Sequence, residues 1–214
     1  MTLVQRAGGA WIIGCTSPES FVMDAFLIST GLVALAEMGD KTQLLALLLA
    51  ARFRKPVPIL LAIFVATLLN HALAAALGQW VSNMVSDDIL RWLLGVSFLA
   101  MAGWMLIPDQ LDDESGSIQK WQKLGVFGAT FVLFFIAEIG DKTQIATVAL
   151  AARFDAIVPV LMGTTIGMMI ANAPAVFIGD KMAGRLPLKL IHGVAAAIFA
   201  LLGLAVLLSP WLAA

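Results

Sequence analysis

The chain has 214 residues, of which 61% are hydrophobic and only 13% are charged, and its mean hydropathy is +0.96. Soluble domains carry about 25% charged residues, so this chain cannot cover itself with a polar surface and is predicted to be an integral membrane protein. The formal net charge is −1, and no basic cluster interleaved with aromatic residues occurs. These features argue against a nucleic-acid partner.

The inventory of reactive side chains argues against an enzyme. Cys15 is the single cysteine, which excludes an internal disulfide and a cysteine-based metal cluster. His71 and His192 are the only histidines, too few for a histidine-rich zinc site. Neither the H-E-x-x-H pattern nor the G-x-S-x-G pattern occurs. We therefore expect neither catalysis nor a resident cofactor.

Taken in chain order, residues 1–22 do not share the apolar pattern of the later segments, and we expect a disordered or membrane-surface extension there. A membrane-spanning helix needs about 20 mostly apolar residues. This length predicts an all-α polytopic protein with six spans, at residues 25–51, 56–86, 92–108, 124–152, 156–179 and 190–214. Residues 109–123 form the longest polar stretch and are expected to be a flexible acidic linker.

The linker separates two similar halves, residues 23–108 and 124–214. They match at an offset of 101 residues, which aligns Glu37 with Glu138 and Pro58 with Pro159. Such internal similarity indicates duplication. With three spans in each half, the second half must enter the membrane upside down relative to the first. Inverted three-helix repeats are a recurring transporter design with the substrate site at the repeat interface.

Lysine and arginine residues predict the orientation of the spans, because loops rich in these residues stay on the cytoplasmic side. Outside the repeated motif, one side of the predicted membrane carries eight of them and the other carries three: Arg52, Arg54, Lys55, Lys120, Lys123, Lys181, Arg185 and Lys189 against Arg6, Arg91 and Arg153. This predicts a multi-pass membrane protein with a cytoplasmic linker and both termini outside.

The matching segments at residues 36–43 and 137–144 read AEMGDKTQ and AEIGDKTQ, and each lies inside an apolar span. An ionisable residue at the centre of such a helix costs at least ~2.5–3.5 kcal/mol, so these residues are functional candidates by default. On a continuous helix the acids and the lysine of each copy share one face. The residues are Glu37, Asp40 and Lys41 in the first copy, and Glu138, Asp141 and Lys142 in the second. The glycine in each motif could permit close helix approach or a local break.

Four carboxylates and two ammonium groups give the predicted site a formal net charge of −2, which one divalent cation would neutralise. Carboxylate, carbonyl and hydroxyl oxygens suit Ca²⁺, Mg²⁺ and Mn²⁺. Auxiliary contacts are expected from the residues that follow the acids, with glutamine favoured over threonine because a regular helix turns the threonine away from the glutamate: Gln43, Gln144, Thr42 and Thr143. Asn70 and Asn172 are expected to serve helix packing first and metal or proton contact second.

Two interpretations of the charges remain open at this point. In the first, a Glu–Lys pair inside each motif only neutralises itself, which leaves Asp40 and Asp141 buried without a partner. In the second, the carboxylates bind the cation and take up protons when it leaves, because an unpartnered buried carboxylate favours protonation. The second interpretation couples cation transport to protons.

Two E-x-G-D-K-T motifs, six predicted spans and an acidic central linker resemble the cation transporter family that includes the Golgi manganese transporter and bacterial manganese exporters. The resemblance covers residues 23–214, and both motifs match without departure. It implies transport of Mn²⁺ or Ca²⁺ in exchange for protons. It also implies that Glu37, Asp40, Glu138 and Asp141 bind the cation. The resemblance, and not the spacing of the residues, selects manganese.

The sequence therefore predicts an exporter of Mn²⁺ whose partners are the cation, protons and the lipid bilayer. A Ca²⁺/H⁺ antiporter is the nearest alternative, and a non-transporting membrane scaffold or sensor that binds a cation is the alternative from another class. An amino-acid exporter, in which the lysines would meet a substrate carboxylate, fits less well with a site of net charge −2. The sequence does not determine the oligomeric state.

Overall fold

The computed structural model describes residues 4–7, 10–13, 18–107, 115–178 and 188–212. The described chain is helical apart from a short antiparallel hairpin, in which β1 (Val4–Ala7) pairs with β2 (Ala10–Ile13). The helices are α1 (Pro18–Glu37), α2 (Lys41–Phe53), α3 (Pro56–Met84), α4 (Asp87–Trp104), α5 (Ser115–Trp121), the 3₁₀ turn η1 (Gln122–Leu124), α6 (Gly125–Glu138), α7 (Lys142–Phe154), α8 (Ile157–Ile178) and α10 (Leu188–Leu212).

Five helical segments of the described chain are long and apolar enough to cross a membrane: Glu19–Glu37, Pro56–Met84, Ile118–Glu138, Ile157–Phe177 and Leu190–Ser209. The structure thus confirms a helical protein with several spans, although the sequence predicted six. The third predicted span corresponds to α4, which is not among the five. Its 18 residues begin with charges, because they include Asp87, Asp88 and Arg91.

The spans predicted at residues 25–51 and 124–152 are each broken inside the motif, so the placement of the acids on one continuous helix face is wrong, and the local break that the motif glycine allowed is confirmed. α1 ends at Glu37 and α2 begins at Lys41, and α6 and α7 are separated in the same way. Gly39 and Gly140 have φ values of +83° and +76°, a left-handed conformation that glycine adopts without strain. The aspartate that follows each glycine is the N-cap of the next helix.

Two segments outside the spans contain regular structure, where the sequence predicted a disordered or membrane-surface extension and a flexible linker. α1 begins at Pro18, five residues before the predicted boundary, and the hairpin precedes it within the expected extension. In the predicted linker, residues 115–124 are helical, whereas residues 109–114 lie outside the described part. Ile118 of α5 is buried and packs with Phe134 and the partly buried Trp121 in one apolar cluster, which explains the order there.

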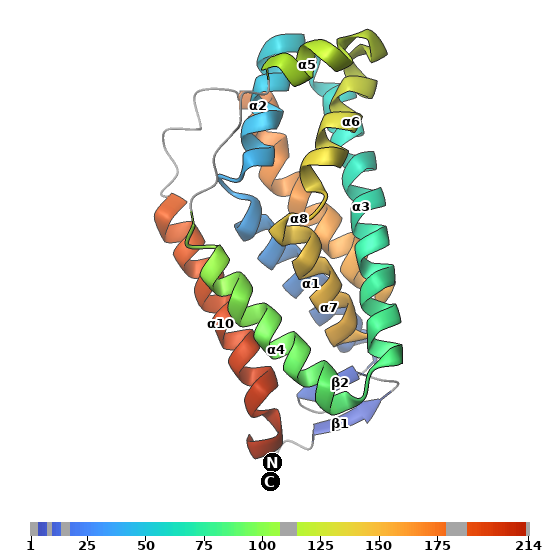
Figure 1. Cartoon of the computed structure of the whole chain (residues 1–214), viewed down its shortest axis with the longest axis vertical. Coiled ribbons are helices and arrows are strands. Elements are labelled where there is room, and N and C mark those ends of the chain that lie inside the picture. The colour runs from blue at the N-terminus through green and yellow to red at the C-terminus, as the bar shows by residue number, and fades with distance from the viewer. Residues whose placement is uncertain (1–3, 8–9, 14–17, 108–114, 179–187, 213–214) are drawn as a thin grey trace.

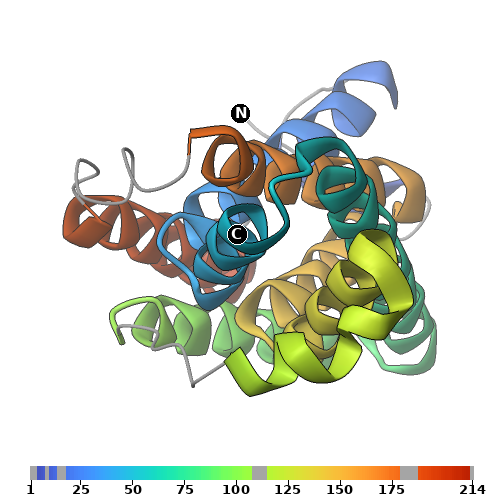
Figure 2. The same ribbon diagram turned by 90° about the horizontal axis from the view of Figure 1, so that it is seen from above.

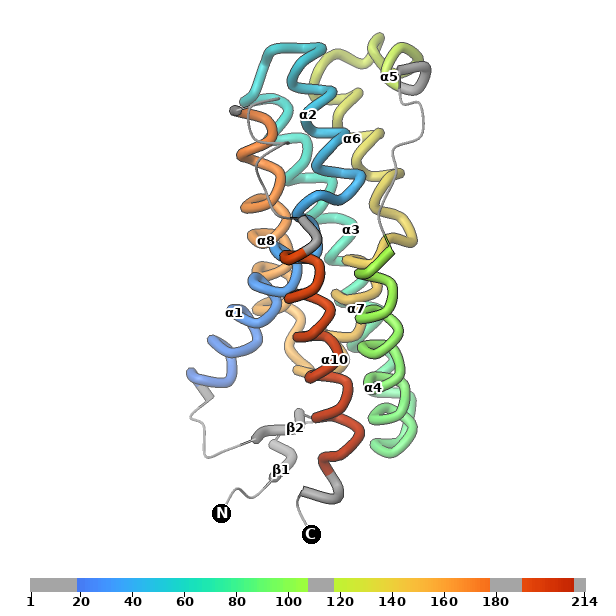
Figure 3. Tube along the Cα trace, turned by 90° about the vertical axis from the view of Figure 1, so that its left-hand side faces the viewer, coloured from blue at the N-terminus to red at the C-terminus, as the bar shows by residue number. Residues whose placement is uncertain are grey.

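The two halves pack reciprocally. α1 packs against α8 of the other half, and α6 packs against α3 in the corresponding way (Figure 1). The same exchange joins α2 to α8 and α7 to α3, while α4 and α10 pack against each other on one side of the bundle (Figure 2). The hairpin and the C-terminal part of α10 lie at one end of the bundle, and α5 lies at the opposite end (Figure 1). In Figure 3, α10 runs away from the end that carries α5.

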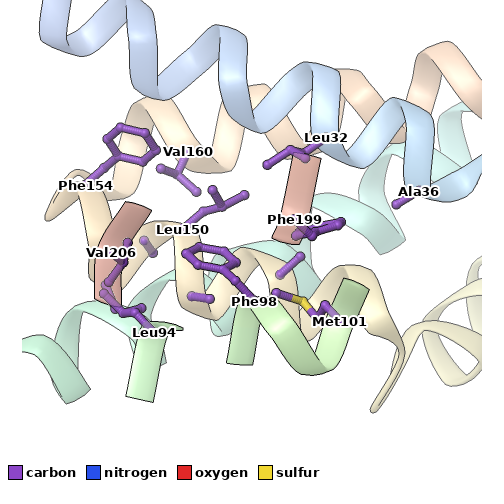
Figure 4. Close-up of a cluster of buried hydrophobic side chains, with 14 of the residues drawn as sticks. Leu32, Ala36, Leu94, Phe98, Met101, Leu150, Phe154, Val160, Phe199 and Val206 are labelled. Carbon is purple, nitrogen blue, oxygen red and sulfur yellow. The ribbon is translucent and has the colours of Figure 1, made fainter. Parts of the chain in front are cut away.

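Aromatic and small residues determine how closely these helices approach. Phe98 of α4 and Phe199 of α10 are aligned by the offset between the halves, and their ring centroids are 6.2 Å apart within a buried apolar cluster (Figure 4). Gly163 and Gly167 of α8 lie directly against the backbone of α1. A Cβ on Gly167 would come within 2.6 Å of the Thr30 carbonyl oxygen. This small-xxx-small spacing lets two backbones meet.

We predict that Gly167→Ala destabilises the protein by ~1–3 kcal/mol, because the added methyl group overlaps the backbone of α1. Gly31→Ala is the matched control in α1, since a Cβ there meets nothing within 4 Å. The control should be neutral or gain up to ~1 kcal/mol from helix propensity. Thermal unfolding in detergent micelles measures the difference, and equal melting temperatures for the two variants would contradict this close packing of α8 on α1.

Candidate cation site

The two helix breaks meet in the middle of the bundle, where α1 and α6 end and α2 and α7 begin (Figure 1). In each copy the glutamate is the last residue of one helix, the aspartate caps the next, and the lysine opens it. The acids therefore stand on irregular backbone and helix ends, and not along one helix face as the sequence suggested. Irregular backbone at membrane depth is tolerated where protein buries it or where it lines a transport path.

Three of the four predicted acids come together. Glu37, Glu138 and Asp141 are all buried, and each offers one carboxylate oxygen such that the three atoms lie within 4.8 Å of one another. One acid comes from the first half and two come from the second. Asp40 is also buried but lies outside this group. We refer to Glu37, Glu138 and Asp141 as the carboxylate cluster.

The two lysines pair with aspartates of the opposite half. Lys41 Nζ lies 2.9 Å from Asp141 Oδ1, and Lys142 Nζ lies 2.8 Å from Asp40 Oδ1. Neither ion pair is the Glu–Lys pair within one motif that the first interpretation of the charges required. The side chain of Lys142 is only 2% exposed, whereas that of Lys41 is 33% exposed. The halves are therefore tied together by crossed ion pairs of unequal exposure.

Threonine, and not glutamine, contacts the glutamates, which reverses the preference derived from a regular helix. Thr42 Oγ1 donates to Glu37 Oε2 at 2.6 Å, and Thr143 Oγ1 donates to Glu138 Oε2 at 3.2 Å. The break in each motif is the reason, because it turns the first residues of the new helix back toward the end of the old one. Each threonine thereby fixes one oxygen of its glutamate.

The glutamines hold the breaks themselves. Gln43 Oε1 accepts a hydrogen bond from the Gly39 amide at 2.9 Å, and its Nε2 donates to the Ala171 carbonyl at 2.7 Å. Gln144 Oε1 accepts from the Gly140 amide at 2.8 Å. The side-chain oxygen of each glutamine is thus committed to the backbone of its own break. These residues shape the site and leave the cluster to the acids and threonines.

One oxygen of each acid in the cluster has no hydrogen-bond partner among the described residues. These atoms are Glu37 Oε1, Glu138 Oε1 and Asp141 Oδ2. Buried carboxylates that repel one another are costly unless a cation or protons neutralise them. The donor set is entirely oxygen, which is the chemistry that Mg²⁺, Ca²⁺ and Mn²⁺ accept.

The two asparagines bond to helix backbone. Asn70 Nδ2 donates to the Phe135 carbonyl of α6 at 3.1 Å, and Asn172 Nδ2 donates to the Met168 carbonyl of its own helix at 3.1 Å. Sequence reasoning missed His192 in α10, whose Nε2 lies 2.6 Å from the Met38 carbonyl oxygen in the first break. The only available signal was a histidine near the start of an apolar span, which does not identify a partner 154 positions away.

Comparison with known proteins identifies related sequences. The family model described as "Divalent cation/proton antiporter GDT1" matches residues 25–113 and 126–213. A Vibrio cholerae protein named "Putative manganese exporter" is 57% identical over 88% of this chain and 92% of its own length. "GDT1-like protein 4" of Oryza sativa subsp. indica is 30% identical over 96% of this chain and 79% of its own. No solved structure matches the chain.

We predict that the two crossed ion pairs differ in strength. Lys142→Met should destabilise the cation-free protein by ~3–5 kcal/mol, because it leaves Asp40 buried without its ammonium partner. Lys41→Met should cost less, because Lys41 is 33% exposed and water can take its place beside Asp141, although that carboxylate is itself buried. Chemical unfolding in detergent with a chelator measures both.

The double variant Asp40→Asn with Lys142→Met provides the control, since it removes both charges of the pair. It should be more stable than Lys142→Met alone, because no uncompensated charge remains. If the loss of stability in the double variant equals the sum of the losses in Lys142→Met alone and Asp40→Asn alone, the pair itself contributes nothing.

Proposed function

We propose that this chain, which belongs to the GDT1 family of divalent cation/proton antiporters, exports Mn²⁺ across the bacterial inner membrane in exchange for protons. The observation that carries the proposal is the carboxylate cluster, with one unpartnered oxygen on each of its three acids. The cation-binding residues would be Glu37, Glu138 and Asp141, with Asp40 acting from the neighbouring ion pair.

Manganese is favoured over calcium by the name of the Vibrio cholerae relative. Ca²⁺ remains the second candidate because the donor set consists of oxygen atoms alone. Thr42 and Thr143 orient the glutamates for either ion by holding one oxygen of each.

The crossed ion pairs suggest how the negative charge of the site is balanced when no cation is bound. Lys41 already neutralises part of the negative charge of Asp141, and Lys142 neutralises part of the negative charge of Asp40. Neither glutamate lies within salt-bridge distance of a lysine among the described residues, and three clustered acids cannot all stay charged in a low-dielectric interior. Protons entering from outside would occupy the cluster as the cation leaves, and the next cation would displace them into the cytoplasm.

Alternating access would arise from movement of the two halves about the cluster. Reciprocal packing of α1 on α8 and of α6 on α3 supports two inverted repeats, with α4 as a shorter sixth span. The positions of the hairpin and the C-terminal part of α10, opposite α5, agree with an even number of crossings (Figure 1). The lysine and arginine distribution favours α5 as the cytoplasmic end.

We predict that Glu37→Gln and Glu138→Gln each lower Mn²⁺ flux into proteoliposomes by roughly 100-fold or more, because loss of outer-shell partners alone costs about 10–100-fold in metal affinity. Glutamine keeps the acceptor for the threonine while removing the charge. Asp88→Asn is the control, since Asp88 is 86% exposed. Undiminished flux in either glutamate variant would refute a shared site.

Cation binding without flux in the wild type would identify a sensor, and amino-acid flux would identify an amino-acid exporter.

We also predict that an opposing pH gradient drives the exchange. Mn²⁺ accumulation should be accompanied by loss of protons from the proteoliposome lumen and should slow when an ionophore collapses the gradient. A lumenal pH dye and a Mn²⁺-quenched dye record both species in one experiment. Flux that is indifferent to the pH gradient, with no proton signal, would make uniport the correct mechanism. Repeating the assay with Ca²⁺ ranks the two cations.

A further inference from the structure

His71 is the only histidine in the middle of a described span, and the carboxylate cluster does not include it. It is fully buried in α3, and neither of its ring nitrogens has a hydrogen-bond partner among the described residues. Thr67, one turn earlier on the same face, is likewise buried with an unpartnered hydroxyl. Buried polar groups are normally satisfied, and an ionisable group at membrane depth is a functional candidate.

The packing of α3 places His71 beside the second helix break. Gly78 lies two turns after His71 on the same side of α3, and a Cβ there would contact Ala151 Cβ of α7 at 3.0 Å. α3 and α7 run in the same direction (Figure 1), so two turns back along α7 lies its first turn, at Gln144. Asn70, adjacent to His71, bonds to the Phe135 carbonyl in the turn before Glu138.

The corresponding position of the other half carries no titratable group. The offset between the halves aligns His71 with Asn172, whose amide donates to the Met168 carbonyl and contacts the Met168 sulfur at 3.0 Å. The two motifs share their acids, lysines and threonines, but the halves differ at this position. A function that needs one proton-binding group beside two equivalent motifs would produce this difference, whereas helix packing alone is served by asparagine.

The charged groups on the helices that pack against α3 are few. α8 carries none between Ile157 and Ile178. α6 ends at Glu138, and α7 begins beside Asp141 with Lys142. The remaining charges on the neighbouring helices and their caps lie at α2, at the end of α7 and at the start of α4, among them Asp40, Lys41, Arg52, Arg153, Asp155, Asp87, Asp88 and Arg91. The charges nearest to the level of His71 are thus those of the second motif, together with Asp40 and Lys41, which pair with them.

We propose that His71 binds one of the exchanged protons and thereby couples proton uptake to cation release. The imidazole accepts a proton at a ring nitrogen when the cation leaves, and the imidazolium then faces the negative second motif in place of the cation. The arrival of the next cation repels this positive charge, and the proton leaves to the cytoplasm. No described contact joins His71 to the carboxylate cluster, so its action is electrostatic. This inference rests on the proposed cation/proton exchange.

The test uses the full chain in proteoliposomes, with Mn²⁺ flux and lumenal pH recorded together. His71→Asn copies the residue of the other half, and His71→Gln is a second isosteric choice. Both should still transport Mn²⁺ down its own gradient but should lose the acceleration by an opposing pH gradient and release fewer protons per Mn²⁺. Thr165→Val is the matched control, because it removes another buried, unpartnered polar group without removing a titratable one. The control should keep the wild-type pH profile.

Each outcome decides between distinct conclusions. An unchanged proton-to-cation ratio and pH profile in both histidine variants would overturn the role of His71 while leaving the exchanger intact. A wild type without proton coupling would overturn the proposed function itself. If both variants fail to fold, ¹⁵N spectra of the two histidines in wild-type protein, assigned with His192→Gln, decide the question. An imidazole at His71 that stays neutral with and without Ca²⁺, over the pH range of transport, would refute the proposal.

Discussion

The crossed pairing of Lys41 with Asp141 and of Lys142 with Asp40 is the constraint on which the rest of the structure depends. Neither half carries a balanced set of charges at its break, so neither can bury its break alone. The halves must meet face to face, which brings the ends of α1 and α6 together and gathers Glu37 and Glu138. Removing one partner of a buried pair costs far more than the pair contributes, so the pairing specifies the arrangement more than it stabilises it.

Much of this arrangement could be predicted from the sequence, because duplication and charge at membrane depth are properties of composition and spacing. The matching segments around Glu37 and Glu138 identified the acids that the structure brings together. The helix breaks could not be predicted from hydropathy, which is continuous across them. A glycine followed by aspartate is nevertheless a typical helix stop followed by an N-cap, and Gly39 and Asp40 adopt these roles.

The contacts that depend on the helix breaks could not be predicted either. A regular helix directs Thr42 away from Glu37, so its hydrogen bond to that carboxylate was not foreseen. The ion pairs between the halves could not be predicted either, because spacing along the chain favours pairing of each acid with the lysine of its own motif. Likewise, the helix that contains Ile118 depends on contacts with apolar residues of α6, which the polar linker sequence does not reveal.

The two halves are similar without being equivalent in this structure. Lys41 is partly exposed and Lys142 is not, although the offset aligns them. α4 and α10 are joined by Phe98 and Phe199. This helix pair contacts the first half through α1, which packs against α10, and the second half through α7, which packs against α4. Under the proposed exchange between inverted repeats, this inequality would correspond to one of two states, and the other state would reverse which half is covered.

The crossed ion pairs also have a consequence for biogenesis. Lys41 leaves the ribosome 100 positions before its partner Asp141, which corresponds to roughly 5–20 s at ordinary rates of synthesis. During that interval the first half carries an uncompensated charge at a helix break, and no intramolecular partner yet exists. Insertion of the first three helices should therefore remain reversible or be assisted until the second motif enters the bilayer, and a chain truncated after the linker should be a substrate for membrane quality control.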